Sequence, residues 1–258
     1  MEGFKKIVYA EALSGLKDSV NEGGLEAVGK KVLDAAKITP VYTNEGNSET
    51  FEEDRKRLNT EAGIVVANHP GYYDTFLILN ALKRKDVKII ASESNFKYFA
   101  PSIGEEYLIK ATNDPTQALA FLRSIKDHID NGGLVVIFPT GGVDRVDNDP
   151  TDFMFENGFS VIIKRCLKPG DMVYSFYINP EDIAALVDET IPRTPGTISA
   201  VALHPSININ KFKDDAEVRV DERYSTADEW QQIVDDSEKE EKNAALSKHF
   251  TDSFKPPK

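Results

Sequence analysis

The sequence contains a single cysteine, Cys166, and no run of apolar residues that approaches the length of a membrane span. One cysteine excludes an internal disulfide and a cysteine-based zinc cluster, which fits a reducing compartment. A spanning helix needs about 18 or more consecutive apolar residues. The segment Met1–Lys6 also lacks the apolar core that a secretory signal would need next. We therefore expect a soluble, cytoplasmic protein.

Basic side chains are also in short supply, with 31 Lys and Arg against 43 Asp and Glu and a net charge of -12. Proteins bind nucleic acid through clustered Lys and Arg, so this balance argues against a nucleic-acid partner. It also argues against broad adsorption to anionic membranes. With 40% hydrophobic residues, the 258-residue chain can bury one large core, and we favour one domain over two.

The N-terminal part is predicted to form a pair of amphipathic helices separated by Gly23 and Gly24. Apolar residues follow helical spacing in both, at Phe4, Val8, Ala12 and Leu16 in the first and at Leu25, Val28, Val32, Leu33 and Ala36 in the second. Because both signs of charge are balanced here, packing on the core is favoured over anchoring on a membrane surface. Transient membrane contact through these helices stays open.

Further along, short apolar runs alternate with helical patterns, which indicates βαβ units. Strands are predicted over Ile64–Ala67, Val87–Ala91, Leu134–Phe138 and Val173–Ile178, and helices over Asp74–Leu82, Pro115–Asp130 and Glu181–Val187. Two more strands are predicted over Ile198–Leu203 and Glu217–Val220, the latter as an exposed edge strand because charged and apolar residues alternate in it. The predicted fold class is α/β, with a mainly parallel mixed sheet flanked by helices.

The end of the chain is again helical in pattern, opened by a capping signal over Ser225–Asp228. It carries an acidic stretch over residues 235–241, which we interpret as a solvated helix face. We divide the single domain, residues 1–258, into an N-terminal helical extension (1–60), an α/β catalytic core (61–224) and a C-terminal helical segment (225–258).

A histidine and an aspartate, His69 and Asp74, lie five positions apart where a predicted strand gives way to a helix. A histidine beside a carboxylate can act as a general base, because the carboxylate fixes the tautomer and stabilises the imidazolium that forms. The alternative is that His69 caps the helix and Asp74 is an ordinary first-turn acid, favoured there by the helix dipole. The pair alone leaves both interpretations open.

The segment from Asn68 to Asp74 resembles the N-H-x4-D signature of the glycerolipid acyltransferase family, which includes glycerol-3-phosphate and lysophosphatidate acyltransferases. Two further blocks agree in order and spacing. Gly104–Lys110 is similar to the family's G-x-x-F-I-x-R block, and Phe138–Val143 is similar to its F-P-E-G-T-R block, at the end of a predicted strand. The resemblance spans about residues 62–178, with Val173–Ile178 as a loose fourth block.

This resemblance implies transfer of an acyl group from acyl-CoA or an acyl carrier protein to a lipid or small hydroxyl acceptor, without an acyl-enzyme and without a metal or cofactor. His69 would deprotonate the acceptor and Asp74 would hold His69. Backbone amides around Gly141 and Gly142 are expected to bind the oxyanion, because glycine lets a backbone approach closely. The substrate-binding positions implied are Asn68, Gly104, Lys110, Phe138, Pro139, Thr140, Gly141, Gly142 and Arg145.

The chain departs from the family pattern at the residues associated with a glycerol-phosphate acceptor. Thr140 and Val143 replace the family's glutamate and arginine, and Arg145 lies two positions later. Lys110 replaces an arginine and lacks its bidentate fork. An acceptor without a phosphate is therefore credible. So are two other functions, a lipid- or acyl-binding protein without turnover and a thioester hydrolase. The sequence leaves the oligomeric state open.

Overall fold

The computed structural model describes residues 15–44, 51–71, 73–141, 155, 158–180, 182, 216–239 and 241–254. The predicted strand over residues 198–203 lies outside this part of the chain, as do Phe4, Val8 and Ala12, and of the predicted helix over 181–187 only Asp182 is described. Among the described residues, no helix combines the length and the apolar character that crossing a membrane requires.

The described residues form a seven-stranded sheet in the order β1-β7-β6-β2-β5-β3-β4. Five of these strands run parallel to one another, while β1 and β7 run in the opposite direction. The predicted α/β class with a mainly parallel mixed sheet is confirmed. The strands are β1 (Ile38–Thr43), β2 (Gly63–Ala67), β3 (Val87–Ala91), β4 (Leu108–Lys110), β5 (Leu134–Ile137), β6 (Met172–Ile178) and β7 (Ala216–Thr226).

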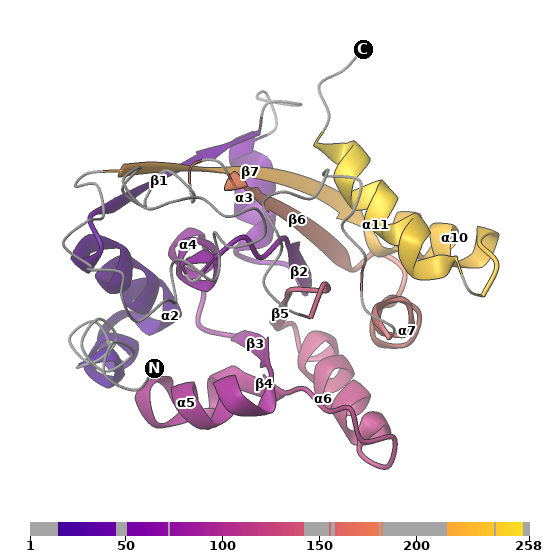
Figure 1. The fold of residues 1–258 in the computed structure, drawn as a ribbon, viewed down its shortest axis with the longest axis horizontal. Coiled ribbons are helices and arrows are strands. Elements are labelled where there is room, and N and C mark those ends of the chain that lie inside the picture. The colour runs from indigo at the N-terminus through magenta and orange to yellow at the C-terminus, as the bar shows by residue number, and fades with distance from the viewer. Residues whose placement is uncertain are drawn as a thin grey trace, which may run out of the picture.

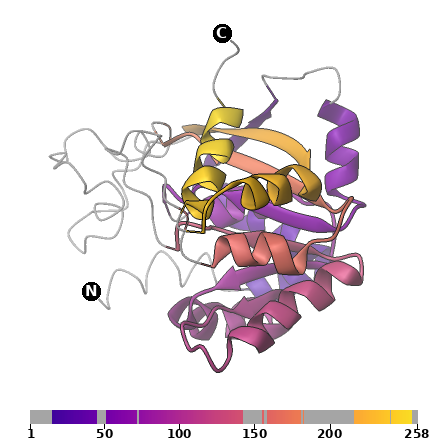
Figure 2. The same cartoon turned by 90° about the vertical axis from the view of Figure 1, so that its right-hand side faces the viewer.

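Helices cover both faces of the sheet (Figure 1). One face is covered by α2 (Leu16–Ala35), α4 (Asp74–Ala81) and α5 (Glu93–Ile103), and α3 (Phe51–Leu58) joins the same apolar cluster through Leu58. The other face is covered by α6 (Ala118–Asp130), α7 (Phe159–Cys166), α10 (Ala227–Asp236) and α11 (Lys242–Ser253). Figure 2 shows these four helices in front of the sheet.

Helix α2 packs directly against α4, the helix that begins at Asp74. A Cβ atom on Gly29 would lie 2.7 Å from the Phe76 carbonyl oxygen and 2.6 Å from the Asn80 nitrogen, so only glycine permits this approach. Within α2, Gly24 has φ 69° and breaks the helical path, as the Gly23–Gly24 pair predicts. For residues 16–35, the prediction of helices packed on the core is confirmed.

Several elements were not predicted, namely β1, α3, α5, β4 and α7. In β1, Pro40 argues against a strand, yet a proline is tolerated at an edge, and β1 is the edge strand of this sheet. The residues assigned to an N-terminal helical extension thus also contribute a strand to the sheet. In α5, Pro101 and a polar first turn conceal the helix from a pattern of apolar spacing.

Two predictions about the C-terminal part are wrong. Strand β7 is not an edge strand, because it pairs with both β1 and β6. Its alternation has another cause: Val218 and Val220 face the core, while Arg219 on the opposite side pairs with Asp182. Ser225 does not cap the following helix, since its hydroxyl accepts a hydrogen bond from the Trp230 indole.

A buried carboxylate in β7 makes the stability of the fold depend on pH. Burial raises the pKa of Glu222 from 4.5 to about 7, although Arg55 lies 3.4 Å away and Tyr224 donates a hydrogen bond to it. An acid with a raised pKa stabilises the fold in its protonated form, so this contribution is present below pH 4.5 and is lost as the pH rises to about 7.

We expect Glu222→Gln to flatten the fall in unfolding free energy between pH 4.5 and about 7, because glutamine keeps the shape and never ionises. Urea unfolding of both proteins across this range measures the difference. Glu52→Gln, at an exposed site on α3, is the control and should follow the wild-type curve. Identical pH dependence of Glu222→Gln and wild type would contradict the assignment.

Candidate active site

The candidate site lies at the carboxyl edge of the parallel strands, where α/β proteins commonly bind ligands. Strand β2 ends at Ala67, and His69 follows two residues later. The neighbouring strand β5 ends at Ile137, so Phe138 reaches the same edge. Helix α4 begins at Asp74, directly after this loop. Three segments that come together at this edge thus supply the central side chains.

His69 and Asp74 form the predicted dyad. The Nδ1 atom of His69 lies 2.8 Å from Oδ2 of Asp74, and the Gly71 amide donates to the same oxygen at 2.7 Å. The Asp74 side chain is fully buried, whereas the His69 side chain is 23% exposed. Tyr73, and not His69, occupies the N-cap position of α4, and Asp74 lies in its first turn.

The imidazole of His69 is also held from a second side. The ring of Phe138 stacks on it with a centroid distance of 4.6 Å and an interplanar angle of 30°. The Asp74 carboxylate holds Nδ1 of the imidazole, and stacking on Phe138 restricts rotation of the ring. A histidine held at Nδ1 by a carboxylate takes a proton at Nε2 when it acts as a general base, and this geometry suits that role.

Asn68, immediately before the histidine, extends the pairing of β2 with β6. Its side-chain oxygen accepts from the Ile178 amide at 2.7 Å, and its side-chain nitrogen donates to the Ile178 carbonyl at 2.8 Å. The residue is only 1% exposed. Asn68 therefore has a positioning role, because it fixes the point from which the His69 loop leaves the sheet. Its predicted contact with substrate stays a prediction.

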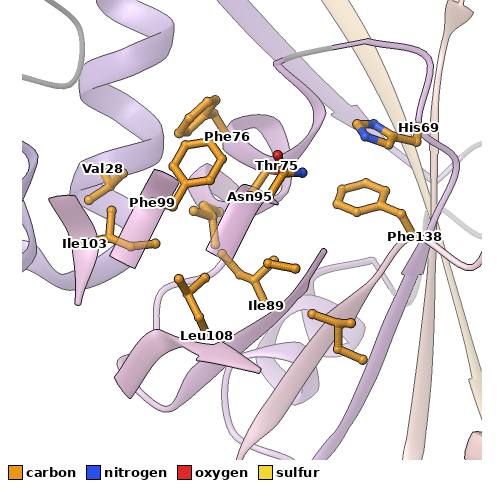
Figure 3. A pocket seen from close by; sticks show the side chains of 13 residues that line it. Val28, His69, Thr75, Phe76, Ile89, Asn95, Phe99, Ile103, Leu108 and Phe138 are labelled. Carbon is orange, nitrogen blue, oxygen red and sulfur yellow. The ribbon is translucent and has the colours of Figure 1, made fainter. Parts of the chain in front are cut away.

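His69 and Phe138 stand at one end of a narrow pocket of about 70 Å³ (Figure 3). The pocket runs between α4, α5 and strand β3, and its remaining lining residues are Val28, Thr75, Phe76, Leu79, Ile89, Ile90, Ala91, Asn95, Phe99, Ile103 and Leu108. All except Thr75 and Asn95 are apolar. A flexible hydrocarbon chain is the type of ligand that such a lining suits.

Comparison with known proteins agrees with this geometry. The model of the family described as Acyltransferase matches residues 46–181, more than half of the chain. The chain belongs to the acyltransferase family. The fold of this acyltransferase is similar to that of the 1-acyl-sn-glycerophosphate (LPA) acyltransferase PlsC from Thermotoga maritima. The TM-score is 0.53 and the identity 17%, over 97% of this chain and 88% of that chain. A search of curated proteins finds no match.

In this acyltransferase, two residues of the second sequence block have structural surroundings. Gly104 ends α5 with φ 101°, and a Cβ atom there would meet the Glu106 carboxylate at 2.5 Å. Lys110 ends β4, where its ammonium pairs with Glu93 at 3.2 Å. Lys97 pairs with the same carboxylate at 3.0 Å. The Glu93 carboxylate thus bridges the ammonium groups of Lys97 and Lys110.

The third block forms a turn after β5. Pro139 is buried and Thr140 is half-buried in this turn. The amide of Gly141 donates to the Phe138 carbonyl at 3.1 Å, with φ 70°. The hydrogen bond of the turn engages this amide, and the expected role of the amides around Gly141 and Gly142 in binding an oxyanion stays a prediction. Gly142, Val143 and Arg145 lie outside the described residues.

Sequence reasoning missed the residues that α5 contributes to the site. Asn95, Phe99 and Ile103 line the pocket from this helix, which was not predicted. Sequence reasoning also missed Thr75, which lines the pocket from α4; its signal was its place directly after Asp74, in the first turn of that helix.

Proposed function

We propose that this acyltransferase moves a fatty acyl group from a thioester donor, acyl-CoA or an acyl carrier protein, to a hydroxyl of a lipid precursor. One observation carries the proposal: the His69–Asp74 dyad opens onto an apolar pocket. A base beside a hydrocarbon pocket can activate a hydroxyl next to the carbonyl of an acyl chain held in that pocket.

The reaction would proceed by direct attack. As the acceptor oxygen bonds to the thioester carbonyl carbon, its proton passes to Nε2 of His69, and Asp74 stabilises the imidazolium. The tetrahedral intermediate then collapses, the carbon–sulfur bond breaks, and the proton passes from His69 to the departing thiolate. His69 and Asp74 return to their starting states, so the cycle balances without a further reactant.

The surroundings of Cys166 support a mechanism without a covalent acyl-cysteine. Burial raises the pKa of this thiol to about 11, and it packs in the cluster on the face of the sheet opposite α4. A neutral thiol is a poor nucleophile, and this one does not line the pocket that contains His69. We therefore propose that the acceptor attacks the thioester directly.

The identity of the acceptor depends on the residues that would bind its headgroup. The T. maritima protein is an acyltransferase for a glycerophosphate, but this chain has Thr140 and Val143 where the family places charged residues, and Lys110 pairs with Glu93. We propose a hydroxyl lipid whose recognition does not depend on a phosphate. Because lipids reside in bilayers, we also propose transient membrane contact by a cytoplasmic protein.

The test is to incubate the purified protein with acyl-CoA or acyl carrier protein donors and a mixed lipid extract, and to identify products by mass spectrometry. We expect a new ester whose acyl part matches the donor. Tight binding of the donor without product, across all acceptors and long incubations, would favour a binding protein and contradict the proposal.

Pocket length should set the acyl chain that is transferred. Ile103 lies at the end of the pocket distant from His69 (Figure 3). We expect Ile103→Phe to lower kcat/KM for long-chain donors by about 10-fold or more, since each rejected methylene is worth about 1–3 kcal/mol. Short-chain donors should react as before.

Ile103→Val is the matched control, because it leaves the end of the pocket open. Competition between donors of graded length, followed by mass spectrometry of the esters, measures the preference. An unchanged chain-length profile in a folded Ile103→Phe protein would show that the acyl chain lies elsewhere.

A further inference from the structure

Two polar side chains, Thr75 and Asn95, interrupt the apolar lining of the pocket. Neither side chain forms a hydrogen bond with any other described residue, although each carries a donor. Thr75 is half-buried and Asn95 is exposed at the rim. Both are therefore available to a ligand that enters the pocket.

Thr75 and Asn95 lie near the His69 end of the pocket (Figure 3). In Figure 3 they lie between His69 and Phe138 on one side and Phe76 and Phe99 on the other. A hydrocarbon tail among the apolar side chains, with its reacting carbon beside His69, would place its carbonyl group next to Thr75 and Asn95. The carbonyl oxygen is the first polar atom that such a chain presents.

This oxygen needs donors, and the Gly141 amide of the third sequence block is already hydrogen-bonded to the Phe138 carbonyl. Thr75 lies in the first turn of α4 and Asn95 in the first turn of α5. The amino ends of helices carry partial positive charge, which adds to the effect of donors placed there. Donors fixed before the reaction stabilise developing negative charge most effectively.

We infer that the Thr75 hydroxyl and the Asn95 side-chain amide donate hydrogen bonds to the thioester carbonyl oxygen and stabilise the oxyanion that forms on it. This inference rests on the proposed function. As the acceptor oxygen adds to the carbonyl carbon, the π electrons of the carbonyl move onto its oxygen. They return when the thiolate leaves, and neither side chain gains or loses a proton.

The test measures kcat and KM of Thr75→Val and Asn95→Leu with an unsubstituted acyl-CoA. Loss of an oxyanion donor lowers kcat by about 10²-fold or more, and we expect this loss with little change in KM. Asn95→Asp should be at least as slow as Asn95→Leu, because a carboxylate repels the oxyanion. Ser94→Ala changes a neighbouring α5 residue that does not line the pocket, and should retain wild-type kcat.

The possible results separate the explanations. Undiminished kcat in both Thr75→Val and Asn95→Leu would overturn the inference, and so would a rise in KM alone, which indicates binding without transition-state stabilisation. The variants could instead still transfer unsubstituted acyl chains and lose a preference for acyl chains that carry a hydroxyl group. That result would show that the pair recognises this substituent, and it would also overturn the inference. Wild-type protein that forms no ester with any donor would overturn the proposed function itself.

Discussion

Replacing His69 with alanine should lower the rate of acyl transfer by about 10³-fold, within the usual contribution of general-base catalysis. The variant loses the group that takes the proton of the acceptor, and the buried Asp74 carboxylate 2.8 Å from Nδ1 cannot substitute for it from its enclosed position. The measurement is kcat with a saturating acyl donor and the acceptor identified by mass spectrometry.

His128→Ala is the matched control for this variant. His128 lies on α6 and bonds to the Asp86 carbonyl, and it does not line the pocket. It should retain wild-type kcat. Circular dichroism and thermal unfolding would test whether His69→Ala is folded. A folded His69→Ala protein that retains most of its acyl transfer would exclude His69 as the base.

Replacing Arg84 with methionine should lower the free energy of unfolding by about 3 kcal/mol, the largest stability effect that we expect from a single polar side chain. Arg84 is buried at the amino edge of the sheet and pairs with Asp86 through two bonds of 2.7 Å. It also donates to the carbonyls of Leu58, Glu61 and Gly132 at 3.1, 2.5 and 2.6 Å.

These contacts join the end of α3 to the loops before β2 and β5, and methionine leaves the carbonyls without their donor. The arginine also lowers the pKa of the Asp86 carboxyl. Urea unfolding measures the loss of stability. Lys85→Met, at the exposed neighbouring position, is the control and should unfold like wild type. Equal stability of Arg84→Met and Lys85→Met would contradict this role.

The centre of the fold could be predicted from the sequence because its signals are local. The apolar run before Asn68 predicts a buried strand, and the Pro70–Gly71 turn followed by an apolar helix predicts where the chain reverses. The structure has β2 and α4 at these places. The same junction holds His69 and Asp74, so the dyad could be predicted together with the strand-to-helix loop.

The elements that were missed depend on partners distant in the sequence. Strand β1 contains Pro40 and forms only because β7, far along the chain, pairs with it. Helix α5 has too few core contacts for its apolar spacing to predict it, since only Ile103 is buried. The alternating charges of β7 predict an edge strand, but β1 and β6, which pair with its two sides, come from distant parts of the sequence.

The proposed oxyanion donors could not be predicted from the sequence for the same reason. Glycines at the end of a strand predict amides that approach a ligand, but the Gly141 amide closes a turn onto Phe138. Thr75 and Asn95, the donors that we propose, come from two helices and meet only in the folded pocket. The sequence spacing between them carries no signal of this meeting.

The most direct test of the account is whether cleavage of the thioester depends on the acceptor. Release of free thiol from acyl-CoA, followed while the acceptor concentration is varied, separates transfer from hydrolysis, because both reactions would use His69. We predict that thiol release rises with acceptor and that each thiol is matched by one ester. Thiol release at the same rate with and without acceptor, matched by free fatty acid, would contradict acyl transfer.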